Sequence, residues 1–217
     1  MPNVSCSQAN CWLARVENCG DSVTQFIHAP GATPLDPDEA AGLIPRHIAT
    51  QAELNAWEEA NILQGERWAF RQQRRDLFEE GFVRDLHRKM FDHTWRWAGT
   101  FRSSNKNLGV EWTQVSVRLR VLLDNTRRQA ELQAFAPDEL ATRFHHQLVW
   151  IHAFSNGNGR HARLMADLLA TRLGRPRLTW GGGSALATSS DLRDRYLEAL
   201  RSADQGQFER LVEFARS

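Results

Sequence analysis

The segment FHHQLVWIHAFSNGNGRHARLMADLLATRLG, residues 144–174, decides the fold of this chain. Apolar residues recur at steps of four and three up to the start of its turn, at Leu140, Phe144, Leu148 and Ile151, which predicts a helix with one buried face. Helical spacing resumes at residues 164–169 and ends at a glycine. The segment therefore predicts two buried helices joined by the tight turn SNGNG.

The turn between these helices has the composition of an anion site. Gly157 and Gly159 let backbone N–H groups approach a phosphate, and the next helix, expected to begin near Arg160, adds unpaired N–H donors and the positive end of its dipole. Arg163 lies three residues after Arg160, hence on the same helix face, and guanidinium groups suit phosphate oxygens. His152, with an ordinary pKa of roughly 6.5, can take a proton from an incoming hydroxyl. A base beside an anion site indicates group transfer.

Two further residues of the turn have roles that follow from their side chains. Asn158 carries both a donor and an acceptor, so it either orients a phosphate or stabilises the turn through its own backbone. Phe154 has no reactive group and is expected to anchor the loop in the core. The alternative for the whole segment is a plain interhelical turn, since Asn and Gly are common in turns.

The rest of the chain predicts a mainly α fold. A capping box, Thr50 with Glu53, begins a long helix to about residue 73, and a second helix is expected over residues 82–95. The turn formers of residues 97–114 predict a short hairpin or flap. Further helices are expected over residues 115–132, 191–202 and 207–216. We expect an N-terminal, loosely ordered arm over residues 1–35 and one domain over residues 36–217.

Composition argues against membranes and nonspecific binding to nucleic acid. The 27 basic and 26 acidic residues nearly cancel, and no stretch approaches the roughly 20 apolar residues that span a bilayer, so a cytoplasmic protein is expected. The three cysteines match no common zinc or redox spacing and are expected to be free thiols: Cys6, Cys11 and Cys19. Five tryptophans stand among apolar neighbours in expected helices, and most of these five are expected in the core: Trp57, Trp68, Trp95, Trp97 and Trp150.

The string HAFSNGNGRHAR, residues 152–163, resembles the Fic family motif H-x-F-x-[D/E]-G-N-G-R-x-x-R at every fixed position except one. WAGTFR and a closing helix with Tyr196 also resemble the Fic core, over roughly residues 75–215. From about residue 33 onward the chain is similar to the Fic-containing group called mobile mystery protein B. The resemblance implies a Fic-type helical bundle with a short β-hairpin flap.

The resemblance implies a protein adenylyltransferase. His152 would deprotonate a Ser, Thr or Tyr hydroxyl of a target protein, which attacks the α-phosphate of ATP. The nucleotide would be held by Phe154, Gly157, Asn158, Gly159, Arg160 and Arg163. The target would add as a strand to the flap, at Ser103, Asn105, Lys106 and Gly109. Implied partners are this protein substrate and a small regulatory, antitoxin-like protein, with neither nucleic acid nor membrane.

Asn156 is the one departure from the motif, because the family has there a carboxylate that helps hold Mg²⁺. Asn keeps an oxygen without the charge, so we expect a weak ligand. Doc-type relatives tolerate Asn at this position, which keeps phosphoryl transfer as an alternative. These relatives carry Lys-Arg where this chain has Gly159-Arg160, and the Gly-Arg pair favours AMP transfer. A weakly active nucleotide-binding regulatory module is the other alternative.

Many Fic proteins carry an inhibitory helix, [S/T]-x-x-x-E-[G/N], whose Glu pairs with the second motif arginine. The expected helix at residues 50–73 offers Glu58 and Glu59, neither of which fits the pattern well. Glu58 is the candidate because it follows the apolar Trp57, and solvated helix carboxylates are the alternative. A metal hydrolase built on His145, His146 and His152 is disfavoured because no H-E-x-x-H spacing exists.

Overall fold

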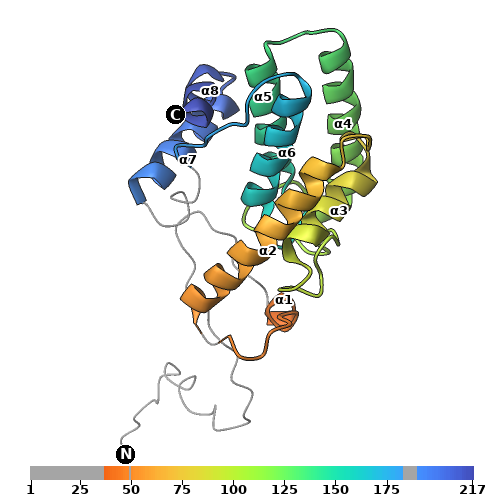
Figure 1. The fold of residues 1–217 in the computed structure, drawn as a ribbon, viewed down its shortest axis with the longest axis vertical. Coiled ribbons are helices and arrows are strands. Elements are labelled where there is room, and N and C mark those ends of the chain that lie inside the picture. The colour runs from red at the N-terminus through yellow and green to blue at the C-terminus, as the bar shows by residue number, and fades with distance from the viewer. Residues whose placement is uncertain (1–36, 49, 183–189) are drawn as a thin grey trace, which may run out of the picture.

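The structure, a computed structural model, describes residues 37–48, 50–182 and 190–217 of the chain, and this part is mainly helical, as predicted. The N-terminal arm and its three cysteines lie outside the described residues. The helices are α1 (Pro37–Ala40), α2 (Gln51–Arg71), α3 (Glu80–Phe91), the 3-10 turn η1 (Trp112–Gln114), α4 (Val115–Glu131), α5 (Pro137–Ile151), α6 (Asn158–Arg172), α7 (Ser190–Asp204) and α8 (Glu209–Arg216). Figure 1 shows α5 and α6 side by side, with α2 crossing in front of α6 and α3 beside α2.

The starts of the helices follow from local sequence. The capping box of α2 forms as predicted: the Glu53 N–H donates to Thr50 Oγ1 at 3.3 Å, and the Thr50 N–H donates to Glu53 Oε2 at 3.0 Å. Pro137 occupies the first turn of α5, where its missing N–H costs nothing. α6 begins at Asn158, two residues earlier than Arg160, where the sequence placed its start.

The expected β-hairpin is not formed among the described residues. The flap, residues 103–110, contains bends but no strand, and an isolated bridge pairs Phe101 with Phe154. The Arg102 N–H donates to Ala153 O at 3.0 Å and the Val110 N–H donates to Ile151 O at 3.4 Å. Both ends of the flap therefore bond to the segment around His152, and this arrangement replaces a ladder between the two arms of the flap.

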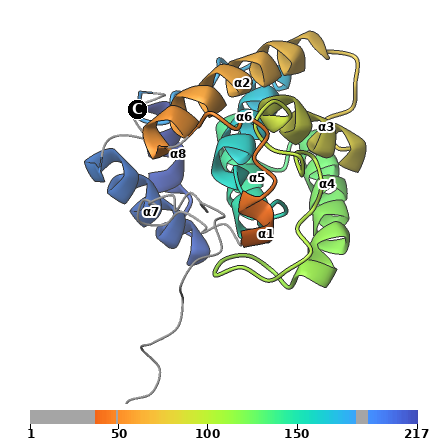
Figure 2. The ribbon, with the colours of Figure 1, turned by 90° about the horizontal axis from the view of Figure 1, so that it is seen from below.

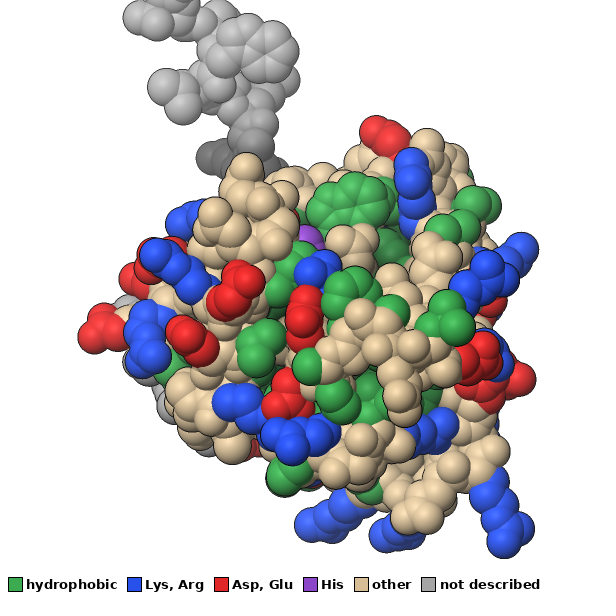
Figure 3. All heavy atoms as spheres, turned by 90° about the horizontal axis from the view of Figure 1, so that it is seen from above, with side chains coloured by type: hydrophobic (Ala, Val, Ile, Leu, Met, Phe, Trp, Pro, Cys, Tyr) green, Lys and Arg blue, Asp and Glu red, His purple; other side chains and the backbone are tan. Residues whose placement is uncertain are grey.

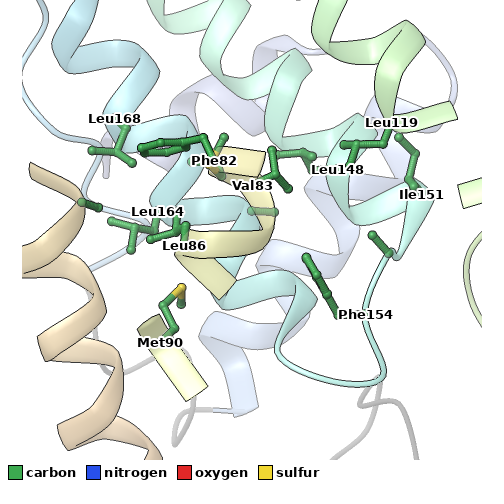
Figure 4. Packing of buried hydrophobic residues seen from close by; sticks show 14 of the residues in the cluster. Phe82, Val83, Leu86, Met90, Leu119, Leu148, Ile151, Phe154, Leu164 and Leu168 are labelled. Carbon is green, nitrogen blue, oxygen red and sulfur yellow. The ribbon is translucent and has the colours of Figure 1, made fainter. Parts of the chain in front are cut away.

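Two apolar clusters share helix α6. The larger one joins α2 to α6 and includes fully buried side chains from α3, α4 and α5 such as Phe82, Leu119 and Ile151 (Figure 4). The smaller one packs α7 and α8 against α5 and α6 through Ala166, Ala170 and their neighbours. Figure 2 shows α5 and α6 in the middle of the bundle. The helix that follows the motif turn is therefore held by packing on two sides.

Most of the five tryptophans named above lie in the core or pack against it. Trp95 is 1% exposed and Trp68 and Trp97 pack against the larger cluster, whereas Trp57 and Trp150 are 39% and 47% exposed. Trp57 lies on the outer side of α2, where its indole N–H donates to His93 O at 3.2 Å. Basic and acidic side chains are interspersed on the face in Figure 3, in line with the near-zero net charge. Among the described residues, no helix combines the length and the apolar character that crossing a membrane requires.

Candidate functional site

The loop between α5 and α6 is closed by the side chain of Asn158. Its Oδ1 accepts from the Phe154 N–H at 2.9 Å and its Nδ2 donates to Phe154 O at 2.7 Å. Asn158 is buried, so of the two roles left open by the sequence its side chain performs the structural one. Phe154 itself is 1% exposed with its ring in the core, as expected for an anchor (Figure 4).

Backbone amides gather at the start of α6. The first intrahelical bond runs from the His161 N–H to Gly157 O at 2.9 Å, so the N–H groups of Asn158, Gly159 and Arg160 precede it. Gly157 has a φ of 77°, and a Cβ there would lie 2.5 Å from the Phe91 ring, so no other residue fits without rearrangement. These amides lie at a helix N-terminus, where the sequence predicts an anion site.

His152 follows α5 directly and is buried beside this site. It takes the left-handed conformation, with φ 54° and ψ 60°, and is 7% exposed. Burial lowers the pKa of His152 to about 4; a bond to the Val149 backbone opposes this shift, and the charges of Arg102 and Lys106 add to it. The imidazole is therefore neutral at pH 7, which is the state a general base requires.

Arg102 is a residue of the candidate site that sequence reasoning missed. It is 3% exposed, and its guanidinium donates to His152 O at 2.6 Å, to Ser104 O at 2.8 Å and to Val110 O. It therefore ties the backbone of the expected base to both ends of the flap. Its His152 partner lies 50 residues away along the chain, and main-chain carbonyls leave no signature in the sequence that could have revealed the contact.

The four expected docking residues of the flap separate into two groups. Ser103 and Asn105 are exposed, in keeping with a docking role. Lys106 instead turns inward. Its side chain is 3% exposed, and its Nζ lies 2.5 Å from Oε2 of Glu39, a residue of α1. Gly109 has a φ of 100°, and a Cβ there would lie 2.5 Å from His152 Cβ, so the flap backbone lies directly on the histidine.

The two motif arginines have different partners. The Arg160 guanidinium lies 5.0 Å from the centre of the Phe91 ring, and its Nη1 lies 2.7 Å from Glu58 Oε2. Arg163 lies 5.7 Å from the centre of the Tyr196 ring, and burial lowers the pKa of its guanidinium. The Tyr196 hydroxyl in turn lies 2.9 Å from His145 Nε2, so α5 and α7 together support Arg163.

Glu58 reaches the site from α2, whereas Glu59 is exposed. Glu58 is 4% exposed, and its second oxygen accepts from the Trp95 indole N–H at 2.7 Å. The alternative of a solvated carboxylate therefore does not hold for Glu58. Its ion pair is with Arg160, the first motif arginine, and this differs from the family pattern, in which the second arginine is paired.

The site offers little to a metal ion. Asn156 Oδ1 is a neutral oxygen that accepts from the Gly157 N–H at 2.5 Å, and the described residues contain no group of three His, Cys, Asp or Glu side chains placed to bind a metal. The donor set therefore does not fit a magnesium ion held by the protein. Of the histidines considered for a metal hydrolase, His145 Nε2 lies 2.9 Å from the Tyr196 hydroxyl and His146 Nε2 lies 2.8 Å from Asp204 Oδ1.

The fold and the loop together define a helical protein with a glycine-containing turn between two buried helices and a neutral histidine at its entrance. Residues 77–170 match the sequence profile described as the Fic/DOC family. This part of the chain, which contains the motif loop, is therefore similar to the Fic/DOC family.

Comparisons with known proteins extend this result. The chain is 29% identical over 138 residues to the protein adenylyltransferase Fic of Aedes aegypti, covering 61% of this chain and 26% of that one. It is 35% identical over 78 residues to the protein of the same name from Nematostella vectensis, covering 36% and 16%. The chain thus spans about a quarter or less of the length of these relatives. Its fold is similar to the N-terminal Fic domain of a VirB-translocated Bep effector from Bartonella quintana with bound ADP, with a TM-score of 0.58, 18% identity, and 79% and 86% coverage.

Proposed function

We propose that this chain is a protein adenylyltransferase that moves AMP from ATP to a Ser, Thr or Tyr hydroxyl of a target protein. The observation that carries the proposal is a buried, neutral His152 beside an N-terminal helix turn whose amides are followed by Arg160 and Arg163. The names of the insect and sea-anemone relatives support AMP transfer. The ADP in the Bartonella Fic domain supports an adenine nucleotide as the ligand.

The reaction can be written from the residues of this chain. His152 takes the proton of the target hydroxyl while the hydroxyl oxygen forms a bond to the α-phosphorus. The bond from that phosphorus to the bridging oxygen breaks, and pyrophosphate leaves. The amides from Gly157 to Arg160 stabilise the charge on the phosphates, and both arginines offset the charge of the leaving group. A bound triphosphate places negative charge near His152, which raises its pKa from about 4 toward the range of an effective base.

Magnesium enters the proposal only with the nucleotide. The family resemblance implies Mg²⁺, but Asn156 contributes at most one neutral oxygen, so phosphate oxygens would supply most of its ligands. The same Asn156 supports the second candidate, phosphoryl transfer of the Doc type. The Gly159-Arg160 pair opposes that candidate.

Two regulatory features complete the proposal. Glu58 acts as an inhibitory residue, because its carboxylate holds Arg160 while no nucleotide is bound. The target segment docks along the exposed part of the flap at Ser103 and Asn105, above His152. A small regulatory, antitoxin-like protein could act on either feature.

Incubation with ATP carrying the label at one phosphate position tests the proposal. In a cell lysate, a label on the α-phosphate should pass to protein and a label on the γ-phosphate should not. The reverse pattern would support phosphoryl transfer, and nucleotide binding without either transfer would support a binding module. His152→Ala should abolish transfer and leave nucleotide binding largely intact, since it removes the base and no phosphate contact. His93→Ala, at an exposed histidine outside the site, is the matched control.

A further inference from the structure

A fully buried histidine outside the motif connects three segments of the site. His87 lies on α3, and its relative exposure is 0%. Its Nδ1 accepts from the Gly99 N–H at 3.0 Å, and its Nε2 lies 3.0 Å from Asn156 O. Its ring stacks on Phe154, with the ring centres 3.7 Å apart and the planes 16° apart. The start of the flap region, the anion loop and α3 therefore meet at one imidazole.

The protonation state of His87 follows from these contacts. A backbone N–H can only donate, so Nδ1 is the unprotonated nitrogen, and the proton of the neutral ring lies on Nε2 and is donated to Asn156 O. A doubly protonated ring has no acceptor for Gly99. Burial lowers the pKa of His87 well below its ordinary value, and the neighbouring His161 lowers it further, which favours the same neutral form.

The hydrogen bond from His87 to Asn156 O also fixes the direction of the next backbone N–H, that of Gly157. Asn156 C=O and the Gly157 N–H belong to one planar trans peptide, so the two groups point in opposite directions. Because His87 holds the carbonyl toward the core, the N–H must point away from the core. The structure agrees, since this N–H meets Asn156 Oδ1, on a side chain that is only partly buried, at 2.5 Å.

We propose that His87 is a positioning residue that sets the direction of the Gly157 N–H, a further donor that comes directly before the amides of Asn158 to Arg160 and that a phosphate would take over from Asn156 Oδ1. The inference rests on the proposed function, because it assumes that this donor meets a phosphate. The stack on Phe154 and the fit of Gly157 against Phe91 hold the loop in place, and the bond from Nε2 selects the orientation of the peptide.

Two isosteric variants separate the bond to the loop from the bond to Gly99. In His87→Gln the side-chain amide nitrogen can take the place of Nε2 and still donate to Asn156 O. In His87→Asn the shorter side-chain amide takes the place of Nδ1, so its oxygen can still accept from the Gly99 N–H. Its nitrogen cannot reach Asn156 O in the loop. His161→Asn is the matched control, because His161 is equally buried in the same cluster but bonds to Val83 O, on α3, at 3.0 Å.

The measurements are the dissociation constant and stoichiometry for ADP by calorimetry, the thermal midpoint, and the ¹H–¹⁵N signal of Gly157 during an ADP titration. His87→Asn should raise the dissociation constant about tenfold, the usual effect of losing one charge-assisted hydrogen bond, and should reduce the ADP-induced shift of Gly157. His87→Gln and His161→Asn should bind ADP within about twofold of the wild type, whatever their thermal midpoints. An irreversibly misfolded fraction would show as fewer binding sites with an unchanged constant. Reversible unfolding would instead raise the apparent constant, and the thermal midpoint identifies that case.

Three outcomes would overturn the inference. The first is an ADP affinity of His87→Asn equal to that of the wild type, and the second is an equal loss in His87→Gln and His87→Asn. The third is a Gly157 signal that moves in the same way in all variants. If wild-type protein fails to bind both ADP and ATP, the proposed function fails with it, and that result is distinct from the other three.

Discussion

Replacing Glu58 by Gln should weaken the fold and strengthen nucleotide binding at the same time. Glu58 joins α2 to the site through two contacts, one with the Trp95 indole N–H and one with Arg160, both at 2.7 Å. Gln has nearly the same shape and keeps an oxygen for Trp95. It removes the negative charge that Arg160 faces, so the change isolates the ion pair from the packing.

The size of the effect follows from burial. A hydrogen bond between charged partners contributes about 1.5–3 kcal/mol, and surface exposure moves a pair toward or below the lower end. The Glu58 side chain is 6% exposed and that of Arg160 is 32% exposed, so we take roughly 1.5 kcal/mol for this pair. Arg160 must give up this contact to reach a phosphate, and removing the competition should tighten ATP binding about tenfold.

Calorimetry with ATP, α-phosphate transfer to lysate protein and urea unfolding measure the three consequences. Glu58→Gln should lower the free energy of unfolding, lower the ATP dissociation constant and raise the transfer rate. Glu59→Gln removes the same charge one residue later on the exposed side of α2 and should change none of them. If Glu58→Gln loses stability while its ATP affinity stays equal to or below that of the wild type, the carboxylate is only structural and the inhibitory proposal is refuted.

Three further predictions follow from the site. Arg160→Ala and Arg163→Ala should each raise the ATP dissociation constant and slow transfer, and unchanged affinity in both variants would contradict the anion site. Asn156→Asp should raise transfer most clearly at low Mg²⁺ and weaken nucleotide binding in chelator; superimposable magnesium curves would show that residue 156 does not touch the metal. The free energy of unfolding should fall as the pH drops from 6.5 to about 4, because in this range the buried histidines bind protons in the unfolded chain but stay neutral in the folded one. Urea unfolding at pH 7 and pH 5 measures this, and equal free energies at the two pH values would contradict it. These histidines are His87, His145, His152 and His161.

The features that the sequence predicted well are those set by near neighbours along the chain. The capping box at Thr50, the proline that opens α5 and the helical spacing of Leu140 to Ile151 act within one or two turns, so their outcome depends on few residues. The motif turn is equally local, because Asn158 bonds to the backbone of Phe154 four residues earlier.

The features that the sequence did not predict depend on distant partners. Arg102 and Lys106 lie in a segment of turn formers, and their partners come from α1 and from the end of α5. The flap bonds to the segment around His152 in place of forming its own ladder, which no pattern within residues 97–114 encodes. Glu58 could be chosen as a candidate, but its pairing with Arg160 depends on how α2 crosses the bundle.

The position of α6 between two apolar clusters affects how ligand binding would be seen by amide hydrogen exchange. The middle of this helix, from Leu164 to Ala170, is buried on both sides, so its amides should exchange only when the whole domain opens. In the first turn of the same helix, the N–H groups of Asn158 to Arg160 make no hydrogen bonds within the helix, so they are not protected in this way. A nucleotide would therefore slow exchange in two distinct ways: directly at Asn158 to Arg160, and further along the helix only by making global opening rarer.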